Sequence, residues 1–201
     1  NVNNSLTFST GTQKHQTYFS AATTNARNIL PNSGYNRYNF TFRDVTKFLK
    51  DKLTVDLSAS YILQDNKNMI AAGKYFNPLP ALYLFPRGDD FDNVRLYQRW
   101  DESRNLYTQA WDYGSGDMSF QNPYWIMNKM INQTKKRRYM LSANLKYDVT
   151  DWLDVTGRVK VDNADMDITE KRYAGTDTNF AGEKGMYSII KRNDRQIYAD
   201  A

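Results

Sequence analysis

The chain has 201 residues, of which 40% are hydrophobic, 14% aromatic and 24% charged, with a formal net charge of +5. This composition is too apolar and too aromatic for a disordered tail. The absence of Cys excludes disulfide scaffolds and thiolate zinc sites, and the single His, His15, excludes multi-His metal sites. No apolar run approaches the ~18–20 residues that a membrane helix needs.

Alternation of apolar and polar residues with a period of two is the dominant pattern, and it predicts β-strands. The pattern begins weakly with Leu6 and Phe8 and continues through an extended segment at 17–24. It is clear at 38–42, at 53–61 and at 139–149, where Tyr139, Leu141 and Leu145 fall on one face. It resumes at 153–161, and 186–201 is a weaker candidate. We therefore expect about seven strands, with a short helical turn at 125–130.

The expected connections alternate between short and long. Tight turns are predicted near 11–16, 47–51 and 150–152, and longer links at 25–35, 66–133 and 168–185. In an antiparallel up-and-down sheet, every second connection lies at the same end. All the tight turns should therefore lie at one end of the sheet and all the long links at the other.

Alternation alone does not separate a soluble β-sandwich from a transmembrane β-barrel. Three features favour the barrel, beginning with strand lengths near ten residues. Aromatic residues stand at the ends of the apolar faces, and charges stand in the middle of the polar faces. The aromatic residues are Tyr38, Tyr61, Tyr139, Tyr147 and the turn residue Trp152; the charges are Asp56, Lys146, Arg158 and Lys160. Because single-chain bacterial barrels have at least eight strands and lipid excludes open sheet edges, we expect a segment of a larger barrel.

One stretch between predicted strands resembles a known family. Residues 28–38, NILPNSGYNRY, are similar to the barrel repeat of the SusC/RagA-type TonB-dependent outer-membrane transporters of Bacteroidetes-like bacteria. The opening residues 1–11 resemble the hairpin that precedes this repeat. Residues 147–153, YDVTDWL, resemble the family's periplasmic hairpin turns. The resemblance covers most of residues 1–167.

The resemblance implies a barrel of about 22 strands in the outer membrane of a Gram-negative bacterium, importing a bulky oligosaccharide or peptide. It implies energy coupling through TonB, a SusD-like surface lipoprotein as a lid, contact with outer-membrane lipid, and a dimer of transporter–lipoprotein pairs. Residues 1–201 would then be part of the barrel domain, with the plug domain outside this sequence. Residues 66–133 would form a long extracellular loop.

The segment 66–133 is rich in aromatic and charged side chains, which stack on sugar rings or peptide side chains and orient polar groups of a ligand. Its candidate ligand-binding residues are Tyr83, Phe85, Arg95, Arg99, Trp100, Trp111 and Tyr113. An alternative is that the aromatic residues pack the segment into a lid or bind the partner lipoprotein. Its four prolines, Pro78, Pro80, Pro86 and Pro123, predict a fixed irregular path.

No catalytic constellation stands out, so we expect neither an enzyme nor a cofactor or metal site. The basic tract Lys135, Lys136, Arg137 and Arg138 is interpreted as a solvated strand end, and no nucleic-acid partner is expected. Two other functions compete with transport: a soluble all-β module that binds glycans or carries an enzyme activity, and a purely structural outer-membrane scaffold or adhesin.

Overall fold

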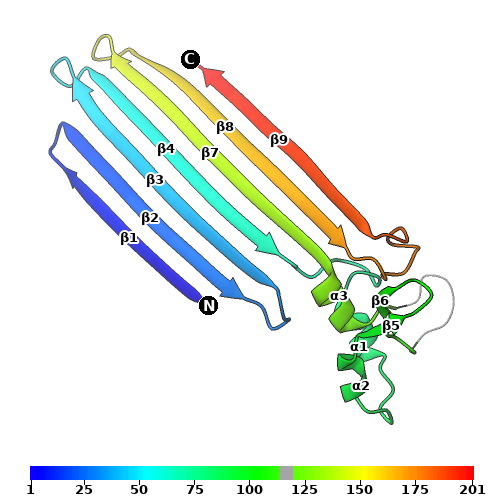
Figure 1. Ribbon diagram of the computed structural model, residues 1–201. Helices are drawn as coiled ribbons and strands as arrows, with labels where there is room; N and C mark the ends of the chain where they lie inside the picture. The colour runs from blue at the N-terminus through cyan, green and yellow to red at the C-terminus, as the bar shows by residue number, and fades with distance from the viewer. Residues whose placement is uncertain (114–119) are drawn as a thin grey trace.

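The computed structural model describes residues 1–113 and 120–201. Its main feature is one antiparallel sheet of seven strands, paired in chain order (Figure 1). The prediction of an all-β chain with about seven strands is therefore confirmed. The strands are β1 (Val2–Gly11), β2 (His15–Arg27), β3 (Gly34–Phe48), β4 (Leu53–Lys67), β7 (Met130–Asp148), β8 (Asp154–Arg172) and β9 (Met186–Asp200).

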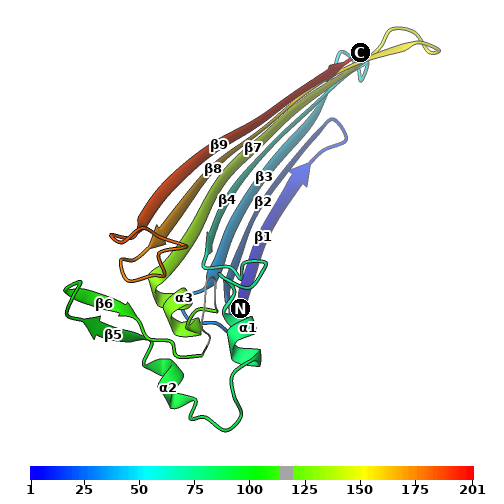
Figure 2. The same ribbon diagram turned by 90° about the vertical axis from the view of Figure 1, so that its right-hand side faces the viewer.

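The segment between β4 and β7, here called the insertion (residues 68–129), lies beyond one end of the sheet (Figures 1 and 2). It holds α1 (Pro78–Tyr83), α2 (Asp92–Arg95), β5 (Gln98–Asp101), β6 (Leu106–Gln109) and α3 (Pro123–Lys129). The expectation that its prolines enforce an irregular path is wrong at three of the four positions, because Pro78, Pro80 and Pro123 lie in short helices. Pro78 and Pro123 each begin a short helix, where proline's missing N–H costs nothing.

The connections alternate as predicted. Tight turns at 12–14, 49–52 and 149–153 lie at one end of the sheet, here called the turn end. The link 28–33, the insertion and the link 173–185 lie at the other, here called the loop end. All three long links are shorter than predicted because the strands continue further. β7 and β8 each have 19 residues, and β7 begins at Met130, before the predicted link ends at 133 and nine residues before the clear alternation starts at Tyr139.

The strand register places the predicted apolar positions on one common face of the sheet. Directly paired residues share a face, and Ala59, Leu141, Val161 and Ile197 form one such row across β4, β7, β8 and β9. Phe8, Phe19, Phe42 and Ala59 form a matching row across β1 to β4. We call the side that carries these rows the apolar face and the opposite side the polar face.

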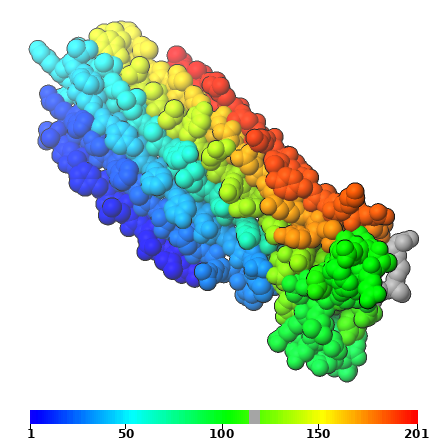
Figure 3. Space-filling view, viewed as in Figure 1, coloured from blue at the N-terminus to red at the C-terminus, as the bar shows by residue number. Residues whose placement is uncertain are grey.

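In the part of the chain that the structure describes, no second layer covers the apolar face. The buried apolar residues belong mainly to the insertion and the neighbouring link, with Trp125 only 1% exposed. On the sheet, by contrast, Leu141, Leu145 and Ile197 are about half exposed or more. The space-filling view shows the strands as one uninterrupted slab, with the insertion projecting past it (Figure 3). This arrangement differs from a sandwich, in which a second sheet seals the apolar side.

Among the described residues, no helix has the length and apolarity required to span a membrane.

Candidate functional site

The insertion is held together by its own small core. Trp125, Ile126 and Met130 form a buried cluster, against which Phe76 and Tyr97 pack. Trp125 and Tyr97 meet edge-on, with their ring centroids 6.5 Å apart. The aromatic residues of this segment therefore divide into a packing set and a more exposed set, and only the second is free to contact a ligand.

Asn122 is the polar centre of the insertion. It is fully buried, and its side-chain oxygen accepts hydrogen bonds from the backbone N–H groups of Tyr124 (2.8 Å) and Trp125 (3.4 Å), which caps α3. Its side-chain amide donates to the carbonyl oxygens of Val94 and Ala110, both at 2.9 Å. One side chain thus joins the start of α3 to α2 and to the residue that follows β6.

The link 173–185 packs against the insertion. The indole N–H of Trp125 donates to the hydroxyl oxygen of Thr176 at 3.1 Å, and both groups are buried. The ring of Phe180 lies 5.1 Å from that of Tyr75 and 5.3 Å from that of Phe76. These contacts fix the insertion over the loop end of β7 and β8 rather than leaving it as a free loop.

The structure brings four of the seven candidate ligand-binding residues together. Phe85 and Tyr113 meet with ring centroids 4.9 Å apart, and Tyr113 and Trp111 are 5.0 Å apart. The guanidinium of Arg99 lies 3.3 Å from the carboxylate of Asp112, the residue between Trp111 and Tyr113 in the sequence. Phe91, which was not among the candidates, joins the group at 5.5 Å from Phe85. We call Phe85, Phe91, Trp111 and Tyr113 the aromatic group.

Among the described residues, no ring pair, hydrogen bond or ion pair joins the other three candidates to the aromatic group. Tyr83 lies at the end of α1 and is 85% exposed. Arg95 pairs with Asp92 one helical turn earlier, at 3.2 Å. Trp100 stacks edge-on with Tyr107, its cross-strand partner in the β5–β6 hairpin, at 5.1 Å.

Acidic residues surround the phenol of Tyr113. Its pKa is raised, first because of its desolvation and then because of the charge of Asp89 and a hydrogen bond to that carboxylate. The charges of Asp112 and Asp90 act in the same direction. The aromatic group therefore combines π faces with a neutral phenol and nearby carboxylates, a set suited to hydroxyl-rich or amide-bearing ligands.

Sequence reasoning missed Asn122 and Thr176, the two buried polar residues that organise this region. A signal for the first was present, because Asn followed by Pro is a typical helix start and occurs at both 77–78 and 122–123. Thr176 carried no such signal, since its partner Trp125 is distant in the sequence.

The polar face carries paired charges and hydroxyl groups. The guanidinium of Arg43 lies 2.7 Å from the carboxylate of Asp56, and the hydroxyl oxygens of Ser58 and Ser142 lie 2.7 Å apart. Arg138 forms a bidentate pair with Asp162. An open hollow of about 1050 Å³ is lined mainly by side chains of this face, including those of Arg43, Asp56 and Ser142. This side of the sheet is suited to contact with water and polar solutes.

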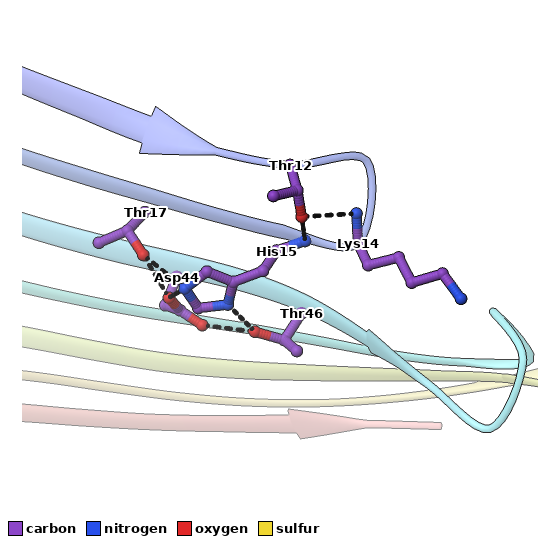
Figure 4. Close-up of polar contacts among 6 residues, drawn as sticks. All are labelled: Thr12, Lys14, His15, Thr17, Asp44 and Thr46. Carbon is purple, nitrogen blue, oxygen red and sulfur yellow. Dashed lines mark hydrogen bonds and ion pairs between the residues drawn. The ribbon is translucent and has the colours of Figure 1, made fainter.

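One polar cluster interrupts the apolar face near the turn end (Figure 4). The hydroxyls of Thr17 and Thr46 donate to the two carboxylate oxygens of Asp44, at 2.7 and 2.8 Å. The ring nitrogens of His15 lie 2.8 Å from the Thr46 hydroxyl oxygen and 3.0 Å from that of Thr17. The four side chains are hydrogen-bonded to one another, so the carboxylate of Asp44 has polar partners on an otherwise apolar face.

Comparison of this sequence with protein-family models and with curated proteins finds no match. The case for a function therefore depends on the geometry described above.

Proposed function

We propose that this chain forms part of the wall of an outer-membrane β-barrel of the SusC/RagA type, which imports a bulky oligosaccharide or peptide. The observation that carries the proposal is the uncovered apolar face of a single-layer sheet whose opposite face is polar. In a transmembrane barrel, the first side contacts lipid and the second lines an aqueous lumen. Contiguous exposed apolar surface of this extent is typical of membrane or partner contact.

The boundaries of the apolar face support contact with a bilayer. Tyr61 and Tyr139 are paired directly across β4 and β7 at the loop-end border of the apolar rows. Near the turn end, Tyr147 is on the same face, and Trp152 stands in the turn with 83% of its surface exposed. Aromatic side chains at both borders of an apolar band are the usual arrangement at the two membrane interfaces.

The stagger of the hairpins also agrees with a barrel. His15, the first residue of β2, pairs with Thr46, and β3 continues beyond it to Phe48. Leu53, the partner of Phe48, pairs in turn with Tyr147, and the turn that follows β7 extends further still. Each turn therefore lies further from the loop end of the sheet than the turn before it. Tilted strands require this displacement if their turns are to form one rim of a barrel.

The two outer strands, β1 and β9, each pair on one side only within the described chain. Their other sides offer rows of backbone donors and acceptors along 10 and 15 residues. Such edges are prohibitive in lipid, so the proposal requires further strands of the same barrel to pair with both.

The insertion and the link 173–185 would stand over the extracellular mouth. There the aromatic group can contact the substrate, and the outer surface of the insertion can contact a SusD-like lipoprotein. Energy would come through TonB and a plug domain. The dimer of transporter–lipoprotein pairs belongs to the same proposal.

Removal of the insertion from the full-length protein tests the transport role. Lys67 pairs with Gln133, and the backbone N–H of Asn68 donates to the carbonyl of Asn132 at 2.7 Å. A short glycine–serine turn in place of residues 70–128 can therefore close β4 and β7 without disturbing the sheet. We expect an assembled barrel in the outer membrane that no longer supports uptake of its nutrient.

A matched control replaces the turn at 149–153, at the opposite end of the sheet, with a similar linker. This variant should assemble and retain uptake. Normal uptake by the variant without the insertion would remove the insertion from ligand handling. A variant chain recovered as a soluble monomer without detergent would contradict the barrel proposal itself.

A further inference from the structure

Charged residues on the apolar face are concentrated beyond the tyrosine border, toward the loop end. The row Tyr61–Tyr139 is followed by Leu63, Arg137, Asp165 and Asn193, and then by Asp65, Lys135, Asp167 and Lys191. Between this border and the tight turns, the apolar face of the strands carries two residues of the Asp, Glu, Lys, Arg and His types, the pair His15 and Asp44. Along each strand, the apolar face thus changes from apolar to charged side chains over about two residues.

Cations outnumber carboxylates in this zone, which we call the cation belt. It contains seven basic residues, Arg27, Lys67, Lys135, Arg137, Lys171, Lys191 and Arg195, against three acidic ones, Asp65, Asp165 and Asp167. Among the described residues, only Arg137 of the seven has an ion pair, with Asp167 at 3.1 Å. The ammonium of Lys171 lies over the ring of Tyr187, 5.6 Å from its centroid. The belt therefore has an excess of positive charge that its own carboxylates do not neutralise.

The turn end of the sheet offers no comparable excess. Its tight turns carry Lys14, Lys50 and Lys52 together with Asp51 and Asp151, and Lys14 is 3.9 Å from Asp51. Positive charge is thus concentrated at one border of the apolar band, on the side that carries the insertion.

We propose that the cation belt binds the phosphate groups of an anionic lipid headgroup in the outer leaflet, of the phosphorylated glycolipid class to which lipid A belongs. The inference rests on the proposed barrel, because it requires the apolar face to lie in a bilayer. The acyl chains then lie along the apolar rows below the tyrosines. The excess positive charge comes from Arg27, Lys67, Lys171 and Arg195, whose rows hold no carboxylate. The phosphates also meet Lys135 and Lys191, whose row is shared with Asp65 and Asp167. Cations at a membrane surface attract anionic headgroups in this way.

The test uses the full-length protein in neutral detergent, titrated with fluorescent lipid A. The double variant Lys135→Gln, Lys191→Gln should bind roughly tenfold more weakly than the parent protein. The turn-end control Lys50→Gln, Lys52→Gln should bind as the parent does. Replacement of the two belt lysines by arginine should preserve binding, which excludes a simple loss of fold.

Competition identifies the source of the phosphate. Dephosphorylated lipid A should not displace the probe, and millimolar inorganic phosphate should displace little of it, because it lacks the acyl chains. Equal affinity of the belt and turn-end variants would overturn the inference, as would displacement by the dephosphorylated lipid. Complete displacement by inorganic phosphate would also overturn it.

A separate readout reports on the barrel. A fluorophore attached through Leu141→Cys should be quenched by brominated acyl chains whatever the headgroup. If the fluorophore is quenched but the belt double variant binds lipid A as tightly as the parent protein, the belt inference alone is refuted. Absence of quenching refutes the proposed function as well.

Discussion

Leu145 is the position where an introduced charge most directly tests contact between this sheet and lipid. It lies on β7 between Ala143 and Tyr147 on the apolar face, and its cross-strand partners are Val55 and Gly157. None of these neighbours can pair with a guanidinium. Arginine on a lipid-facing strand costs about 2–4 kcal/mol at the bilayer midplane and less toward the interfaces. Leu145 lies between Ala143 at the middle of the apolar band and Tyr147 at its border, so we expect about 2 kcal/mol. Since each 1.4 kcal/mol is a factor of ten, a cost of about 2 kcal/mol means that Leu145→Arg should lower the folding equilibrium constant by about 30-fold.

The matched control is the next residue along the strand. Asn144 faces the opposite side, where its cross-strand partners are Asp56 on β4 and Arg158 on β8. Asn144→Arg places the same charge beside a carboxylate on the polar face, so we expect a change within about 1 kcal/mol. The assay is reversible unfolding of the full-length protein in lipid vesicles by guanidinium chloride. Equal small effects of the two substitutions would refute the assignment of the faces, and a larger loss from Asn144→Arg would reverse it.

Two further predictions concern the insertion. Asn122→Ala leaves two carbonyl groups and the first turn of α3 without partners, and should destabilise the insertion by about 2–4 kcal/mol. Limited proteolysis should then cleave it faster, with exposed Asn93→Ala as the control, and unchanged cleavage would show that Asn122 does not organise this region. Because the pKa of Tyr113 is raised on folding, its contribution to stability is complete below the ordinary tyrosine pKa and declines as pH rises through the folded value. Asp89→Asn should shift the ultraviolet tyrosinate titration of Tyr113 to lower pH, assigned by difference from Tyr113→Phe, and an unmoved titration would contradict the role of that carboxylate.

The sequence predicted the sheet well where one face is apolar and poorly where both faces are polar. Residues 139–149 alternate clearly, and the apolar half of β7 was found from them. Clear alternation begins only at Tyr139, because Lys135 and Arg137 point to one side and Lys136 and Arg138 to the other. Charge on both faces hides the period of two, so this tract was interpreted only as a strand end. The charged half of β7 is held in the sheet by pairing with β8, which single-sequence periodicity does not report.

The candidate site was predictable only in composition. The abundance of aromatic residues in the insertion indicated stacking surfaces, and Phe85, Trp111 and Tyr113 do lie together. Their grouping depends on turns between residues far apart in the sequence, as does the separation of Tyr83 and Trp100 from them. Long-range contacts of this kind leave no local pattern, whereas the Asn–Pro helix starts at 77–78 and 122–123 do.

The central claim is that one face of this sheet contacts lipid while the other contacts water. This chain has no Cys, so single cysteines at 140 to 146 can each carry a nitroxide spin label in the membrane-embedded protein. Collisions with oxygen, which is enriched in lipid, should peak at 141, 143 and 145, and collisions with a water-soluble nickel chelate should peak at the even positions. Equal accessibility of both faces to the nickel chelate, or oxygen maxima at the even positions, would contradict the account.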